Sequence, residues 1–156
     1  MNVVFQAQQL LRPQHLNIMD LSIFPDSIGM SKNSTKELTL ESIASKLTYF
    51  QEQIHLLHWQ TNSYAEHKNL GSLYEYIQEF KDDLVEKLMG YTGKKPAVYK
   101  LEPLSTSTSN VVVDELISFA KSLKEYGEMN CYQDVCNLSD SLSGEAAKVK
   151  YLLTLT

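Results

Sequence analysis

LESIASKLTYFQEQIHLL, residues 40–57, carries the repeat that decides the fold of this chain. Its apolar residues recur at intervals of three and four, which is the period of a helix that buries one stripe of side chains. They are Leu40, Ile43, Leu47, Phe50, Ile54 and Leu57. The repeat therefore predicts a helix. Two N-caps fit its start, because Ser34 with Glu37 matches a capping box and Thr39 is an equally good cap.

A second run of the same kind predicts a second helix. Its apolar positions are Leu70, Leu73, Ile77, Phe80, Leu84 and Leu88, and the run ends near Gly90 or Gly93. About half a dozen residues separate the two runs, and a connection that short joins antiparallel helices. The single tryptophan, Trp59, is expected to anchor the end of the first helix through its indole ring.

The second half of the chain predicts two more helices after a long connection. Residues 91–110 contain both late prolines and a Ser/Thr cluster, so they are expected to cross the bundle without forming a helix. Asn110 would then cap a third helix marked by Val112, Leu116, Phe119 and Leu123. A fourth runs from Val135 to Leu152, interrupted only at Gly144. Four helices with one long crossover predict an all-α, ferritin-like four-helix bundle.

The first 33 residues differ from the rest. FPDSIG at 24–29 is a turn-rich break, and the apolar residues before it could form one short helix or pack as an arm. We therefore expect two parts, an N-terminal extension at residues 1–33 and the bundle at residues 34–156.

Composition limits the classes of partner and location. The formal net charge is −5, so the chain has no electrostatic surface for nucleic acid. Its apolar runs are too short for a membrane span, and residues 1–18 lack the pattern of a secretory signal. These features predict a cytoplasmic protein with no nucleic-acid or membrane partner. Cys131 and Cys136 form no metal or redox motif and are expected to be free thiols.

Histidines and carboxylates offer candidate metal ligands. At about 100° per residue, His67, Asp82 and Glu86 fall within one arc that is expected to border the core. Oxygen and imidazole ligands suit iron, manganese and zinc. Glu52 and His55 form one Glu-x-x-His unit of the kind used in di-iron bundles. Because no histidine follows residue 67, a di-metal site within one chain is incomplete.

Residues 40–90 resemble the core of the Dps branch of ferritin-like proteins, the mini-ferritins. The matching residues are His58-Trp59, Tyr64-Ala65-Glu66-His67, Leu73-Tyr74 and Asp82-Asp83-Leu84-Val85-Glu86-Lys87. The resemblance implies a metal site shared between two subunits, with His58 and His67 from one and Asp82 and Glu86 from the other. Gly71 stands where that family has an aspartate, and the loop between the two histidines is shorter than in the family pattern.

The resemblance implies a homo-oligomer that binds iron, with zinc or manganese as alternatives. Loss of the bridging carboxylate at Gly71 implies weak or absent ferroxidase activity, so whether the chain is an enzyme stays open. HWQTNSYAEHKNLGSLYE, residues 58–75, is also similar to small ferritin-like proteins of tailed phages. That similarity implies a location in the host cytoplasm or in a virion.

Two other functions remain open. The chain could be a non-catalytic phage structural or assembly protein with virion proteins as partners, in which His58 and His67 pack against aromatic rings and hydrogen-bond a neighbour. A bundle that binds a peptide or a small molecule through its nine tyrosines is a further hypothesis, which rests on composition alone.

Overall fold

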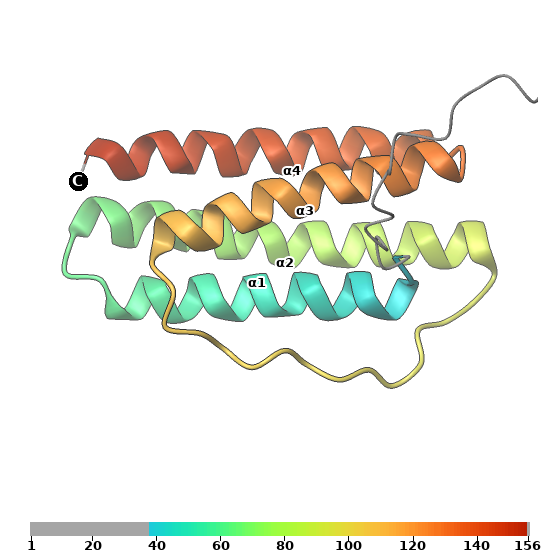
Figure 1. Cartoon of the computed structure of the whole chain (residues 1–156), viewed down its shortest axis with the longest axis horizontal. Helices are drawn as coiled ribbons and strands as arrows, with labels where there is room; N and C mark the ends of the chain where they lie inside the picture. The colour runs from blue at the N-terminus through green and yellow to red at the C-terminus, as the bar shows by residue number, and fades with distance from the viewer. Residues whose placement is uncertain (1–37, 156) are drawn as a thin grey trace, which may run out of the picture. The chain divides into compact units, whose positions relative to one another are not determined.

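The computed structural model describes residues 38–155, so the predicted extension at residues 1–33 lies outside the described part. Four helices make up most of it: α1 Leu40–Gln60, α2 Tyr64–Thr92, α3 Ser109–Met129 and α4 Gln133–Leu152 (Figure 1). The short 3₁₀ helix η1 Leu153–Leu155 follows α4. No strand occurs within residues 38–155, and the prediction of an all-α four-helix bundle is confirmed.

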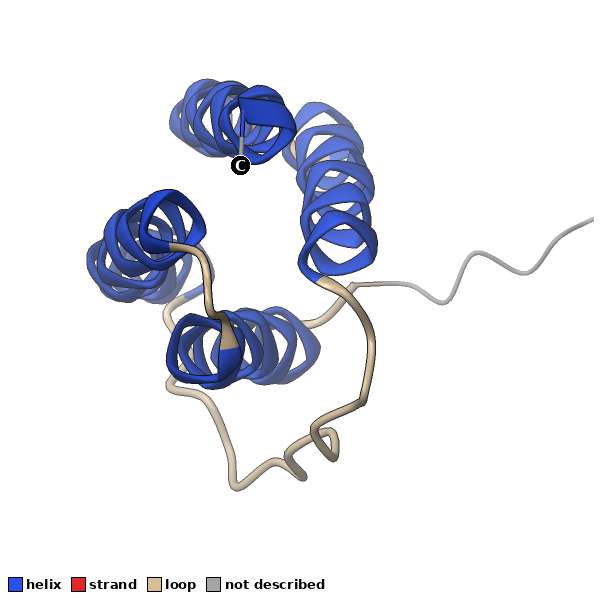
Figure 2. Ribbon diagram, turned by 90° about the vertical axis from the view of Figure 1, so that its left-hand side faces the viewer, coloured by secondary structure: helices blue, strands red, loops and turns tan. Residues whose placement is uncertain are grey.

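The four helices form two antiparallel hairpins, α1 with α2 and α3 with α4. Between the hairpins, α2 contacts α4 and α1 contacts α3, and the view along the bundle shows the helices at four corners (Figure 2). Residues 93–108 run back along the outside of α1, so α3 starts at the same end of the bundle as α2 (Figure 1). We call this segment the crossover. The crossover returns the chain along the bundle, as the sequence predicts. It is shorter than the non-helical connection expected at residues 91–110.

The core consists of the apolar stripes that the helical repeat predicts. The largest fully buried side chains are Phe50, Ile43, Leu47, Ile54, Leu70, Leu73, Ile77, Leu84, Leu88, Leu116, Leu123 and Leu142. Phe50 of α1 meets Phe119 of α3 with ring centroids 5.7 Å apart, which joins the two hairpins. Burying one such side chain stabilises the fold by about 1.5–3 kcal/mol, so the stripes are the main source of stability.

Local capping chemistry sets where the helices begin. Thr39, not Ser34, caps α1: its Oγ1 accepts from the Ser42 N–H at 3.2 Å, and Ser42 Oγ accepts from the Thr39 N–H at 2.8 Å. Ser63 caps α2 by accepting from the Glu66 N–H at 3.3 Å. The α1–α2 connection is therefore only residues 61–63, shorter than the apolar pattern predicts, because the first turns of α2 bury no apolar residue before Leu70.

Other boundaries confirm some expectations and correct others. Gly93 ends α2 in the left-handed conformation, with φ +66°, where a glycine is favoured. Thr108 precedes α3, so Asn110 lies in its first turn and the prediction that it caps this helix is wrong. Helix α4 passes through Gly144 without interruption.

Cys131 and Cys136 are free thiols, as predicted. None of the helices in the described part of the chain has the length and apolar content of a membrane span.

Candidate functional site

His58 and His67 form a reciprocal pair that joins the end of α1 to the start of α2. His58 Nδ1 lies 2.7 Å from the carbonyl oxygen of His67, and His67 Nδ1 lies 2.9 Å from the carbonyl oxygen of His58. Their rings stack with centroids 3.8 Å apart and planes inclined by 21°. A carbonyl oxygen only accepts hydrogen bonds, so each Nδ1 carries a proton and donates it. In the neutral rings the lone pair is therefore on Nε2.

This stacking limits how the pair can bind a metal. A metal ion lies about 2 Å from an imidazole nitrogen, along its lone pair in the ring plane. Two planes inclined by only 21°, with centroids 3.8 Å apart, do not meet within that distance. Both rings therefore cannot bind one ion without leaving the stack. Each Nε2 can still bind an ion separately, and metal-bound histidines commonly donate their other ring N–H to a carbonyl.

Asp82 and Glu86 lie far from the histidines of the same chain. Asp82 follows His67 by fifteen positions of one helix, which is about 22 Å along its axis. Both acidic side chains are exposed, so the expectation that they border the core is wrong. No group of three or more His, Cys, Asp or Glu side chains within residues 38–155 is placed to hold a metal. A site that combines all four predicted ligands therefore requires a second chain.

Gly71 has a packing role beside the histidine pair. A Cβ atom at this position would lie 3.2 Å from His58 Cε1 and 3.3 Å from His58 Nδ1. Contacts that short force the ring to move. The glycine therefore permits the close approach of α1 and α2 at His58, and an aspartate here would compete with the stacked arrangement.

Aromatic rings from both α1 and α2 pack around His58. His55 stacks on Tyr74 with centroids 4.1 Å apart, and Tyr74 meets the His58 ring edge-on at 5.4 Å. His58 thus packs against an aromatic ring and hydrogen-bonds a neighbour, as the alternative to metal binding predicts. The sequence predicts that Trp59 anchors the end of α1; its ring lies against His55 with centroids 4.1 Å apart, but it is 66% exposed and does not enter the core.

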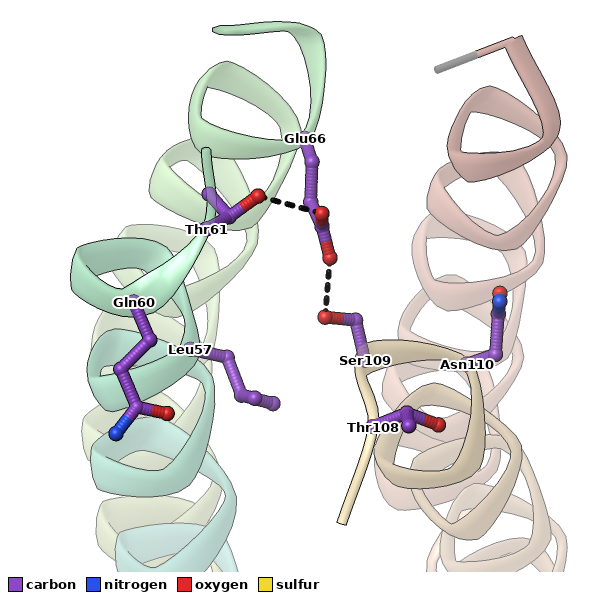
Figure 3. Close-up of a pocket in the computed structure, with 7 residues that line it drawn as sticks. All are labelled: Leu57, Gln60, Thr61, Glu66, Thr108, Ser109 and Asn110. Atoms are coloured by element: carbon purple, nitrogen blue, oxygen red, sulfur yellow. Dashed lines mark hydrogen bonds between the residues drawn. The ribbon is translucent and has the colours of Figure 1, made fainter. Parts of the chain in front are cut away.

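Glu66 connects the α1–α2 turn to the start of α3, a role that the sequence pattern did not predict. Thr61 Oγ1 donates to Glu66 Oε2 at 2.6 Å, and the Ser109 hydroxyl donates to Glu66 Oε1 (Figure 3). The Ser63-x-x-Glu66 spacing fits a capping box, but this carboxylate turns toward α3. The carboxylate borders a cavity of about 260 Å³, lined by Leu57, Gln60, Thr61, Glu66, Thr108, Ser109 and Asn110.

Polar side chains along α1 hold the crossover against the bundle. The Ala97 N–H donates to Glu41 Oε1 at 3.1 Å, and Ser45 Oγ donates to the carbonyl oxygen of Lys100 at 2.7 Å. Gln53, two further turns along α1, is fully buried under the crossover. The hydrogen bond from Ala97 is the largest cause that lowers the pKa of the Glu41 carboxyl below its ordinary value. In the sequence, Glu41, Ser45 and Gln53 recur at multiples of four residues beside the apolar stripe, and this spacing could have indicated that they contact the crossover.

Comparison with known proteins places the chain in a family. A model described as a family of unknown function (DUF5856) matches residues 58–153, from His58 to η1. An uncharacterized 14.6 kDa protein from the mobD-ri intergenic region of Enterobacteria phage T4 is 28% identical over 134 residues, which are 85% of this chain and 98% of the phage protein. No solved structure matches the chain significantly, and the ferritin-like relationship stays a prediction. Because the family model covers more than half of the sequence, the chain belongs to the DUF5856 family of unknown function.

Proposed function

We propose that this protein is a non-catalytic helical bundle with a structural or assembly role in a phage. The observation that carries the proposal is the reciprocal pair of His58 and His67, whose Nδ1 atoms both donate to backbone carbonyls while the rings stack. The two best candidate ligands of the chain thus hold α1 and α2 together. The relative in phage T4 supports the association with a phage.

Exposed apolar side chains support a role in protein contacts. The end of α1, the start of α2, the start of α3 and the end of α4 meet at one end of the bundle (Figure 1). Large exposed side chains occur on all four and on η1, which follows α4: Trp59, Tyr64, Val111, Tyr151 and Leu155. Trp59 and Tyr64 are 66% and 77% exposed, and exposed aromatic residues are frequent energetic centres of protein interfaces. This end of the bundle is therefore the surface that best suits a virion or assembly partner.

Metal analysis tests the non-catalytic role. The purified full chain is incubated with Fe²⁺ in air, or with Zn²⁺, and the metal retained per chain is measured after desalting. We expect no stoichiometric metal and no Fe²⁺ oxidation faster than in buffer. Mass spectrometry of purified virions of the encoding phage should also detect the protein. Stoichiometric metal that is lost in His67→Ala would contradict the proposal.

We propose a weak metal site between two chains as the second candidate function. Its specific support is that both Nε2 lone pairs remain available while Nδ1–H donates to a carbonyl. One histidine of one chain would then meet Asp82 and Glu86 of another, with iron, zinc or manganese as the ion. Asp82→Asn distinguishes the two roles, because this exposed residue should affect metal retention without changing the thermal stability of the metal-free protein.

A further inference from the structure

The outer face of α2 carries an acidic stripe that no lysine neutralises within the described residues. The stripe consists of Glu75, Glu79, Asp82 and Glu86, all exposed and none in an ion pair among residues 38–155. Of the three lysines of α2, Lys81 Nζ donates to Gln51 Oε1 at 2.7 Å, Lys87 pairs with Asp83, and Lys68 lies about 10 Å before Glu75 along the helix. From its first to its last residue the stripe extends about 17 Å along the helix.

The crossover presents the opposite charge. Lys94, Lys95 and Lys100 are all exposed, and Lys95 and Lys100 form no ion pair within the described residues. An extended chain covers at most about 20 Å between the first and the last of these lysines, close to the length of the acidic stripe. The charge and the length of the two surfaces therefore match.

Apolar side chains point outward from the same segment at intervals of three residues. Val98 is fully exposed, and Leu101 and Leu104 are 55% and 47% exposed. The inward side is held on α1 through the Ala97 N–H and the Lys100 carbonyl. An outward row that is already held in place costs little conformational entropy when it binds. The half-buried Val85 and Met89 near the acidic stripe offer apolar surface to meet it.

We propose that the crossover of one copy of this chain docks on the acidic stripe of α2 in a second copy. Seen along the bundle, the crossover lies outside α1, and α2 occupies a different corner, so the two surfaces of one chain face different directions (Figure 2). Two different surfaces can pair twice across a two-fold axis, or once head-to-tail in a contact that closes into a ring or continues as a filament. The contact does not depend on the function proposed above, since a metal-binding bundle would carry the same surfaces.

Paired charge reversals in the full chain, kept in EDTA, test the contact. One variant carries Lys95→Glu and Lys100→Glu, and the other carries Glu75→Lys and Glu79→Lys, which leaves the candidate metal ligands unchanged. Light scattering should give wild-type masses of two or more chains at about 0.05 M NaCl and a single chain at about 0.5 M, where screening shortens the reach of charge. Each variant alone should stay monomeric. An equimolar mixture should assemble, because each chain then meets a complementary surface.

Lys121→Glu with Lys148→Glu is the matched control, because these exposed lysines of α3 and α4 produce the same change in net charge as the crossover variant. The control should assemble like the wild type. A wild-type protein that is monomeric at low salt overturns the proposal, as does an oligomer that survives both charge reversals. Failure of the mixture to assemble, while each variant is monomeric and folded by circular dichroism, also overturns it.

Discussion

The side-chain amide of Gln53 pairs with both backbone polar groups of Ser105. Gln53 Nε2 donates to the Ser105 carbonyl at 3.1 Å, and the Ser105 N–H donates to Gln53 Oε1 at 2.7 Å. Gln53 is fully buried, so the amide takes the place of a neighbouring peptide group for the end of the crossover. This pair fixes the crossover just before α3 begins.

Replacing Gln53 should loosen the crossover. Gln53→Ala leaves the Ser105 N–H and carbonyl without these hydrogen bonds, and the loss should lower the free energy of unfolding by about 2–4 kcal/mol in urea titrations. Gln51→Ala is the control, since this half-buried amide on the same helix bonds the Lys81 side chain near the surface. Its effect should stay below about 1 kcal/mol. Equal losses in the two variants would show that the Ser105 pairing does not matter.

Substitutions of His67 should reveal which ring nitrogen matters. In His67→Asn the amide nitrogen is bonded to Cγ, as Nδ1 is, so the hydrogen bond to the His58 carbonyl can form. His67→Gln moves the donor one bond further out. We expect the glutamine variant to be less stable than the asparagine variant by about 1 kcal/mol, the typical value of one hydrogen bond. Thermal unfolding of both proteins gives the comparison, and a more stable glutamine variant would contradict the assigned tautomer.

Two glycine-to-alanine substitutions separate packing from helix propensity. Gly144 has nothing within 4 Å of its added Cβ, so Gly144→Ala should stabilise the protein by about 1 kcal/mol. Gly71→Ala gives the same increase in helix propensity, but its added Cβ lies 3.2 Å from His58 Cε1 and forces the ring to move. Its free energy of unfolding should therefore be lower than that of Gly144→Ala by about 1 kcal/mol or more. Chemical denaturation measures both free energies of unfolding. Equal stabilisation by Gly71→Ala and Gly144→Ala would contradict the close approach at His58.

Loss of the Glu66 carboxylate should uncouple α3 from the α1–α2 turn. Glu66→Ala removes the acceptor of the Thr61 and Ser109 hydroxyls, and Ser109 is buried. Stability should fall by about 1–3 kcal/mol. A double-mutant cycle with Ser109→Ala should return a coupling energy of at least about 0.5 kcal/mol, and strict additivity would mean that the contact contributes nothing.

Low pH should remove the contribution of the Glu41 carboxylate to the stability of the folded protein. Its pKa is lowered in the folded protein by the hydrogen bond from Ala97, so the stabilisation is present above the unfolded pKa and is lost as pH falls through the folded pKa. The wild type should therefore melt at a higher temperature than Glu41→Gln at neutral pH. The difference should shrink as pH falls below about 4.5, the ordinary pKa of a glutamate carboxyl, because the unfolded chain then takes up a proton that the folded protein binds less readily. A difference that is constant between neutral pH and about pH 3 would contradict the role of the ionised group.

The residue types in the sequence identified candidate ligands, but the sequence did not predict how these residues are arranged in space. The resemblance to the mini-ferritins implied His58 and His67 as ligands, yet the structure stacks their rings and places Asp82 and Glu86 far along α2. A helical repeat specifies which side of a helix is apolar. It does not specify how closely two helices approach, and that approach at Gly71 sets the position of the His58 ring.

The sequence by itself determined the four helices, the antiparallel pairing of α1 with α2 and the crossover, because apolar period, caps and proline positions act within a few residues along the chain. Only the tertiary structure decided that Gln53 is buried, that Trp59 is exposed and that Glu66 reaches Ser109. The burial of Gln53 and the reach of Glu66 depend on contacts between residues 43 or more positions apart, Gln53 with Ser105 and Glu66 with Ser109. A local pattern carries no information about a neighbour that only folding brings close.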